Sequence, residues 1–299
     1  EYFGIKRNKE SKGILTSYMR DPIGGDPAYI KARPAMLVIP GGGYACVSDR
    51  EGEPVALEYL NRGYHAFVLD YDVAPDCCYP SQILEAAMAM IYIRKNADRF
   101  GIEKNQVAAI GFSAGGHLLG CISTLWDDPA IREKFGEDCA LVRPDASVYS
   151  YAVISSDEEI WHRGSFVNFR KDKVSFENYS IEKKVRPSCS PAFIWSTTAD
   201  DGVPVLNSVR LYEAYVKAGV PAEMHLFREG GHGLSTCDRE VLGEVFPACG
   251  HIRNWISLSV GFLEGLGFRV RWWRYRRAKD RAADFFTEAR PAYALRRMR

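Results

Sequence analysis

The sequence of 299 residues lacks the features of several protein classes. It has no apolar run near the roughly 20 residues that a membrane-spanning helix needs. Charged residues between Glu1 and Ser11 stand where a signal peptide would have its apolar core. We therefore expect no membrane span and a cytoplasmic location, unless a leader has been removed. With 46% hydrophobic and 26% charged residues, the composition excludes general disorder and is typical of globular domains.

Cysteine is present but is not arranged for metal binding or for a disulfide framework. The eight cysteines stand singly except for Cys77 and Cys78, and there is no C-x-x-C pair. No cluster of cysteine and histidine has zinc-site spacing. Adjacent cysteines rarely bridge each other because the ring that they would close is strained. We expect free thiols, as in a reducing compartment, and neither a metal nor an organic cofactor.

The net charge of +1 conceals an uneven distribution. Residues 268–299 include eleven basic and three acidic side chains, a net charge of +8, which leaves −7 for the rest. A mildly acidic body gives no reason to expect a nucleic-acid partner. We predict one α/β domain over residues 1–267, followed by a basic extension over 268–299. The extension has no assigned role, and a basic amphipathic helix on a membrane surface is the alternative.

Short apolar segments alternate with amphipathic ones along the domain. Strands are expected at 35–39, 65–71, 107–110, 146–154, 192–196 and 222–227. Helices are expected at 53–61, 81–100, 116–125, 205–218 and 240–266. Ser48 and Glu51 have the spacing of a capping box before the first of these helices. The alternation predicts a mostly parallel sheet with helices on both faces, and residues 155–191 form a polar, cap-like excursion.

The strongest motif is the pentapeptide from Gly111 to Gly115, G-F-S-A-G, between an expected strand and an expected helix. This is the setting of a G-x-S-x-G nucleophile elbow. The turn is so tight that side chains at either glycine would clash with the neighbouring backbone. Ser113 would stand above the sheet edge at a strained backbone conformation, beside free amides of the following helix. We predict that Ser113 is a nucleophile.

Three glycines follow the first expected strand, in P-G-G-G-Y from Pro40 to Tyr44. Glycines let the backbone approach a substrate, and their amides together with that of Ala114 would form an oxyanion hole. A phosphate-binding loop is the rival interpretation, but no G-K-S/T or G-x-G-x-x-G pattern follows. The position upstream of an elbow favours the oxyanion hole. Tyr44 is a candidate contact for substrate.

His232 lies between glycines after the last expected strand, where the general base of such a hydrolase belongs. The acid is expected between serine and histidine in the chain, and Asp200 and Asp201 both follow the preceding strand. Among the other histidines, His162 in the polar excursion is a candidate contact for substrate. His117, one turn into the elbow helix, is expected to pack behind it.

Several segments together resemble the α/β-hydrolase esterases that include acetyl xylan and feruloyl esterases, relatives of the hormone-sensitive-lipase-like group. They are P-G-G-G-Y, S-D-R-E-G-E-P from Ser48, G-Y-H-A-F-V-L-D-Y from Gly63, I-G-F-S-A-G-G-H from Ile110 and E-G-G-H-G from Glu229. The resemblance covers about residues 34–267. It implies Asp200 as the acid, four residues before Pro204, and the amides of Gly42, Gly43 and Ala114 as oxyanion donors.

The chain departs from the family pattern at three places. Asp72 stands where these esterases usually carry Arg, S-T-T from Ser196 replaces the usual His-Thr, and Pro40 replaces the His of the commoner lipase loop. None of these positions belongs to the expected triad.

The sequence thus predicts a serine hydrolase that cleaves short acyl esters, acetate first, on a small molecule or an oligosaccharide. An enzyme of the prolyl-oligopeptidase type is an alternative, although those usually carry a large propeller and only about 34 residues precede the first expected core strand. A non-catalytic ligand-binding protein on the same fold is a second alternative, although such proteins typically lose the nucleophile or the base. The sequence gives no indication of oligomeric state.

Overall fold

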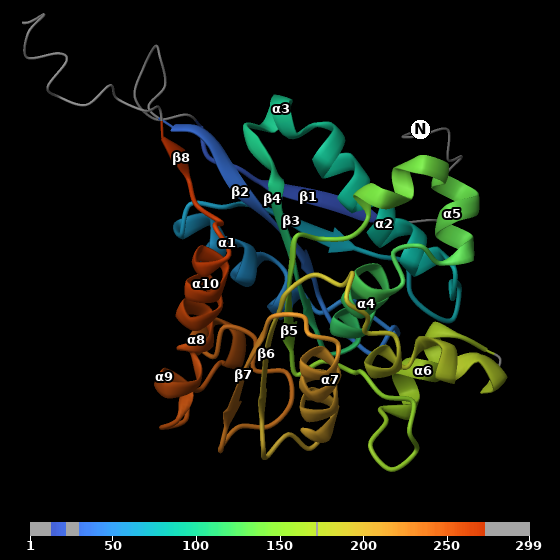
Figure 1. Ribbon diagram of the computed structural model, residues 1–299. Helices are drawn as coiled ribbons and strands as arrows, with labels where there is room; N and C mark the ends of the chain where they lie inside the picture. The colour runs from blue at the N-terminus through green and yellow to red at the C-terminus, as the bar shows by residue number, and fades with distance from the viewer. Residues whose placement is uncertain (1–12, 22–29, 172, 273–299) are drawn as a thin grey trace, which may run out of the picture.

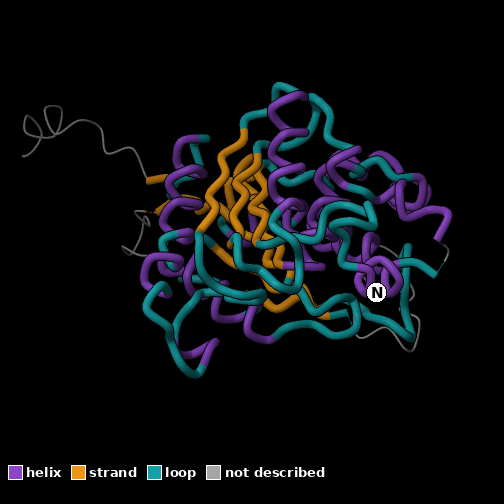
Figure 2. Tube along the Cα trace, turned by 90° about the horizontal axis from the view of Figure 1, so that it is seen from below, coloured by secondary structure: helices purple, strands orange, loops and turns teal. Residues whose placement is uncertain are grey.

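The computed structural model describes residues 13–21, 30–171 and 173–272. A twisted sheet runs through the centre of the molecule, and helices cover both of its faces (Figures 1 and 2). The strands are β1 (Ile14–Tyr18), β2 (Ile30–Ile39), β3 (His65–Asp70), β4 (Ile102–Phe112), β5 (Ala146–Ser150), β6 (Ala192–Thr197), β7 (Ala222–Phe227) and β8 (Arg271–Trp272). Their order is β1-β3-β2-β4-β5-β6-β7, and β8 pairs with β2 outside this path. β1 is antiparallel to β3, while β3, β2, β4, β5, β6 and β7 are mutually parallel.

The helices that cover the sheet are short to medium in length. They are α1 (Glu53–Asn61), α2 (Ser81–Lys95), α3 (Ala97–Phe100), α4 (Ser113–Thr124), α5 (Pro129–Phe135), α6 (Arg163–Phe169), α7 (Leu206–Lys217), α8 (Arg239–Leu242), α9 (Cys249–Ile252) and α10 (Trp255–Gly265). The 3₁₀ helices are η1 (Asp49–Glu51), η2 (Gly136–Leu141), η3 (Lys173–Tyr179) and η4 (Ile181–Lys183). In the described part of the chain, no helix is long and apolar enough to cross a membrane.

The central strands are apolar on both faces, because each face is buried under its own layer of helices. On β2, Leu37 and Ile39 belong to a core shared with α2, α4 and α7. The alternate residues Met36 and Val38 belong to a second core shared with α1, α9 and α10. Side chains alternate along a strand, so one continuous apolar run supplies both cores. The α/β fold expected from the alternation of segments is confirmed.

Several expected boundaries are wrong. The strand expected over 146–154 ends at Ser150, because Tyr151 takes a φ of 36°, outside the extended region. The helix expected over 240–266 is three helices: Gly243, at a φ of 72°, terminates α8, and Pro247 has no amide hydrogen to continue a helix. The expected capping box is absent, since the Ser48 side chain caps no helix and the Glu51 carboxylate bonds elsewhere.

The start of the expected basic extension packs against the domain. Phe268 is only 3% exposed and belongs to the second core. The amide of Arg269 donates to Oε1 of Gln106, and β8 pairs antiparallel with β2. Residues 273–299, and with them most of the expected extension, lie outside the described residues. All eight cysteines are free thiols.

Candidate active site

The parallel strands bring four loops to one edge of the sheet. The glycine turn follows β2, Ser113 follows β4, Asp200 follows β6 and His232 follows β7. In a sheet of parallel strands, the carboxyl ends lie at the same edge, and this edge is where such folds bind ligands. The segments that carry the expected catalytic residues therefore meet there, although they are far apart in the sequence.

Ser113 occupies a strained turn between β4 and α4. Its φ is 49°, a left-handed conformation that is costly for a residue with a side chain. The flanking glycines are obligatory: a Cβ on Gly111 would lie 2.4 Å from the Gly115 carbonyl oxygen, and a Cβ on Gly115 would lie 2.2 Å from that of Ile39. The sharp elbow expected from the motif is what the structure shows.

A series of hydrogen bonds connects the side chains of Ser113, His232 and Asp200. Nε2 of His232 lies 2.8 Å from Oγ of Ser113, and Nδ1 lies 2.9 Å and 3.1 Å from the two carboxylate oxygens of Asp200. The Asp200 side chain has no exposed surface, and the His232 side chain is 25% exposed. This is the geometry of nucleophile, general base and orienting acid.

The two neighbouring aspartates contact His232 at different places. Oδ1 of Asp200 accepts hydrogen bonds from the amides of Gly202 (2.9 Å) and Val203 (2.8 Å). These bonds fix the orientation of the carboxylate relative to the His232 ring. Oδ1 of Asp201 instead accepts the main-chain amide of His232 at 3.3 Å. The Asp200 carboxylate therefore contacts the imidazole ring, as expected of the acid, whereas the Asp201 carboxylate contacts only the main chain of the loop that carries the ring.

The glycine turn supplies free amides beside Ser113. Within the described ranges, no acceptor is found for the amides of Gly42 and Gly43. The amide of Ala114 lies in the first turn of α4, where helical amides have no intrahelical partner. Gly42 has a φ of 118°, and a Cβ there would lie 2.2 Å from the Cys46 carbonyl oxygen, so no other residue fits. These three amides are the expected oxyanion donors.

The expectation that Tyr44 contacts substrate is corrected by its burial. Its side chain has no exposed surface, and its hydroxyl donates to Nδ1 of His117 at 2.9 Å. Nε2 of His117 lies 2.8 Å from the carbonyl oxygen of Tyr179, which can only accept, so Nε2 carries the proton and Nδ1 accepts. Burial lowers the pKa of His117 to about 4 and keeps the ring neutral. As expected, His117 packs behind the elbow, where it anchors the glycine turn through Tyr44.

The excursion between β5 and β6 borders the site through α6. Nδ2 of Asn168 donates to the carbonyl of Gly43 at 2.9 Å, and Nδ1 of His162 accepts from the Ser165 amide at 3.2 Å. A Cβ on Gly43 would lie 3.9 Å from Cε1 of His162. Burial and the nearby His232 lower the pKa of His162. His162 thus stands beside the oxyanion turn.

Two further residues lie at the site although the sequence pattern predicts other roles for them. The pattern predicts a capping box at Glu51 and a strand through Tyr151. Instead, the Glu51 carboxylate accepts hydrogen bonds from the Gly41 amide and from the Tyr151 hydroxyl. The signal available in the sequence was the segment S-D-R-E-G-E-P itself, which places an acid close after the glycine turn.

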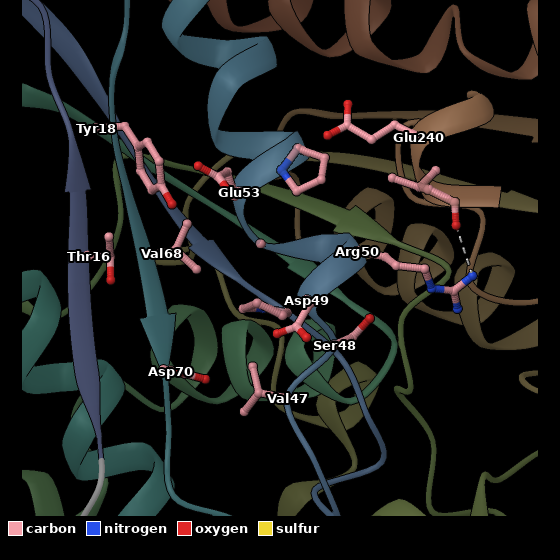
Figure 3. A pocket seen from close by; sticks show the side chains of 14 residues that line it. Thr16, Tyr18, Val47, Ser48, Asp49, Arg50, Glu53, Val68, Asp70 and Glu240 are labelled. Atoms are coloured by element: carbon pink, nitrogen blue, oxygen red, sulfur yellow. Dashed lines mark hydrogen bonds between the residues drawn. The ribbon is translucent and has the colours of Figure 1, made fainter. Parts of the chain in front are cut away.

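A separate pocket of about 450 Å³ lies beside β1, β3 and the start of α1 (Figure 3). Its lining includes four carboxylates, those of Asp49, Glu53, Asp70 and Glu240. Burial and the neighbouring Asp49 raise the pKa of Asp70. None of Ser113, Asp200, His232, Gly42 and Gly43 lines this pocket, so it is distinct from the candidate active site. Across the described residues, no group of three or more His, Cys, Asp or Glu side chains is placed to hold a metal ion.

Known proteins share both the sequence and the fold of this chain. Residues 26–215 match the family model BD-FAE. The chain is 36% identical over 217 residues to endo-1,4-beta-xylanase B of Butyrivibrio fibrisolvens, covering 70% of this chain and 33% of the relative. It is 33% identical over 209 residues to the acetylxylan esterase of Xylanibacter ruminicola, and the match covers 67% of this chain and 41% of that relative. The chain therefore spans less than half the length of these two curated relatives.

A solved structure matches over most of both chains. The acetyl ester-xyloside bifunctional hydrolase of Caldicellulosiruptor lactoaceticus is 33% identical and superposes with a TM-score of 0.73, covering 85% of this chain and 88% of the other. The family model covers more than half of the sequence, and the elbow, the sheet order and the helical layers agree with the α/β-hydrolase fold. On these grounds, the chain belongs to the BD-FAE family and has the α/β-hydrolase fold.

Proposed function

We propose that this chain is a serine carboxylesterase that cleaves short acyl esters, with Ser113 as nucleophile, His232 as general base and Asp200 as orienting acid. The observation that carries the proposal is the unbroken series of hydrogen bonds from the Ser113 hydroxyl through the His232 ring to the buried Asp200 carboxylate. A hydroxyl becomes nucleophilic when an adjacent base removes its proton, and this arrangement provides that base.

The reaction is acyl transfer in two steps. Nε2 of His232 takes the proton of Ser113 as Oγ attacks the ester carbonyl, and the carbonyl oxygen becomes an oxyanion. The amides of Gly42, Gly43 and Ala114 stabilise that charge, each contributing about 3 kcal/mol to barrier lowering. The protonated ring then gives its proton to the leaving alcohol. His232 then takes a proton from water as the water oxygen attacks the acyl carbonyl, and returns that proton to Oγ as the bond from Oγ to the acyl carbon breaks, which releases the carboxylic acid and restores Ser113.

Acetyl groups on sugar hydroxyls are the proposed substrate. The names of an acetylxylan esterase and an acetyl ester-xyloside hydrolase among the relatives support this choice. His162 supports it chemically: Nδ1 is occupied by Ser165, so the neutral ring carries its proton on Nε2. A ring N–H beside the oxyanion turn suits a hydroxyl of the alcohol portion.

The test compares the release of acid from p-nitrophenyl esters of increasing acyl length, acetylated xylan and feruloylated sugars. We expect the highest kcat/KM for acetyl esters and acetate release from xylan. Ser113→Ala is expected to lower p-nitrophenyl acetate hydrolysis by about 10⁴-fold or more with unchanged circular dichroism. Activity retained in Ser113→Ala would refute the nucleophile. Cleavage of p-nitrophenyl acetate without acetate release from xylan would refute only the sugar substrate.

A further inference from the structure

A buried carboxylate that the mechanism above does not use lies between two of the loops at the site. Glu51, at the end of η1, is 3% exposed. Its Oε2 accepts the main-chain amide of Gly41 at 2.8 Å, and its Oε1 accepts the hydroxyl of Tyr151 at 2.6 Å. Buried acids are rare in proteins unless their oxygens are satisfied in this way. Both bonds lead to segments that carry the proposed catalytic groups.

The first bond, from the Gly41 amide to Glu51, contacts the turn that carries the proposed oxyanion donors. Gly41 immediately precedes Gly42, and a Cβ on Gly41 would lie 2.8 Å from Oε2 of Glu51 and 2.9 Å from Cβ of Ser113. The Gly41 main chain is therefore held between the Glu51 carboxylate and the nucleophile. Because Gly42 and Gly43 follow Gly41 directly in the chain, a bond that holds the Gly41 amide also constrains the positions of their amides.

The second bond reaches the histidine loop through Tyr151. The Tyr151 hydroxyl accepts the main-chain amide of Ser235 at 2.9 Å, three residues after His232, and gives its own proton to Glu51. The Tyr151 ring stands edge-on to the His232 ring, with 5.0 Å between centroids. Burial and the adjacent carboxylate raise the pKa of Tyr151, so the phenol keeps the proton that it donates.

We propose that Glu51 is a positioning residue that fixes the oxyanion turn and, through Tyr151, the loop of His232 relative to Ser113. This inference rests on the proposed esterase function. One carboxylate with two acceptor oxygens meets two donors on two different loops, which neither an amide nor a shorter acid can do. An error of about 1 Å in such positions costs on the order of 100-fold in rate.

The expected signature is a fall in kcat with little change in KM, because the oxyanion forms only in the transition states. Both acylation and deacylation pass through an oxyanion, so kcat reports the effect whichever step is slower. Glu51→Gln places an NH₂ group against one of the two donors. We expect its kcat on p-nitrophenyl acetate to fall about 10- to 100-fold and its KM to stay within about threefold.

Glu53→Gln is the matched control, since it makes the same change in charge two residues away on an exposed side chain. We expect it to retain wild-type kinetics. Glu51→Asp keeps the charge but is one methylene too short, and we expect it not to restore kcat. Tyr151→Phe removes the second bond together with the acceptor of the Ser235 amide, leaves the bond from Gly41 to Glu51 in place, and serves if Glu51→Gln fails to fold. Its loss and that of Glu51→Gln should not add in the double variant, because they interrupt one network.

Titration of active sites with a fluorophosphonate gives kcat per functional site and separates positioning from loss of folded protein. Wild-type kcat per site in Glu51→Gln or in Tyr151→Phe would overturn the inference, and so would a loss confined to KM. An inactive wild type would instead refute the proposed function, so the two failures are distinguishable.

Discussion

Two adjacent carboxylates contact His232, and their surroundings decide which one serves the ring. The Asp200 carboxylate has no exposed surface and accepts two main-chain amides besides the imidazole N–H. Such a carboxylate can fix one tautomer of the ring and stabilise the imidazolium that forms during catalysis. Asp201 instead accepts the main-chain amide of His232 at 3.3 Å. The residues alone left both open, and only the family resemblance selected Asp200.

Asp200→Asn and Asp201→Asn therefore separate the two roles. In Asp200→Asn the new side-chain amide would face Nδ1 with a donor and favour the wrong tautomer, so kcat should fall by about 10⁴-fold. The Asp201 substitution keeps an oxygen acceptor for the His232 amide, so kcat/KM should stay within about threefold of wild type. Initial rates on p-nitrophenyl acetate measure both, and circular dichroism controls for folding. A larger loss in the Asp201 variant would reverse the assignment.

Helices and strands with strong periodicity were predictable, and the failures occur where strand pairing or a local backbone turn overrides the apolar pattern. The α1 bounds agree with the expected range, and α7 agrees within one residue at each end. The apolar pattern does not predict β1 or the first half of β2, because polar residues interrupt it there. Those strands form by pairing with neighbours, which periodicity does not reveal. Tyr151 was placed in a strand because it continues an apolar run, although its φ of 36° ends that strand.

The convergence of Ser113, Asp200 and His232 was predictable because the topology of a parallel sheet determines where its strands end. Parallel strands end at one edge, so a serine, an acid and a histidine that follow three such strands must lie near each other. Glu51 and Tyr151 have no such rule. They are 100 residues apart, and their contact depends on the path of two loops beyond the strand ends. The expectation that Tyr44 contacts substrate is wrong for the same reason, because the path of its loop directs the buried side chain to His117.

His117 makes the stability of the folded protein depend on pH. Its pKa is about 4 in the folded protein, against an ordinary value of 6.5. Between these values the unfolded chain binds more protons than the folded one, so stability falls as pH falls through that window. The contribution is about 2–3 kcal/mol between pH 7 and pH 4. Urea unfolding of wild type and His117→Gln at several pH values measures it.

The variant is expected to be less stable at pH 7 and to lose less stability on acidification. His251→Gln is the control, because it makes the same substitution at a histidine that is exposed on α9. His65, whose pKa burial also lowers to about 4, contributes the same sign and remains in both variants. Equal pH slopes for wild type and His117→Gln would contradict the prediction.

The loops that carry Ser113, Asp200 and His232 meet at one edge of the sheet, and Phe268, near the end of the described residues, packs into the core on one face of that sheet. Phe268 fills the core that also contains Trp255 and Leu263 of α10, on the face beneath α1. Val270 lies over Gly63, where a Cβ would come within 2.8 Å of its Cγ2. The expected boundary at residue 267 would separate these side chains from the domain that they cover. We propose that the domain extends to residue 272.

Two truncations test where the domain ends. Removal of residues 268–299 exposes the core that Phe268 covers and deletes the pairing of β8 with β2. Burial of one Phe side chain is worth about 3 kcal/mol, so Tm should fall by about 5–10 °C. Removal of residues 273–299 leaves these contacts in place and should keep Tm and the kcat on p-nitrophenyl acetate near the values of the full chain. Phe268→Ala in the full chain should reproduce most of the first effect. Equal Tm values for the two truncations would return the boundary to residue 267, because they would mean that residues 268–272 add nothing to the folded domain.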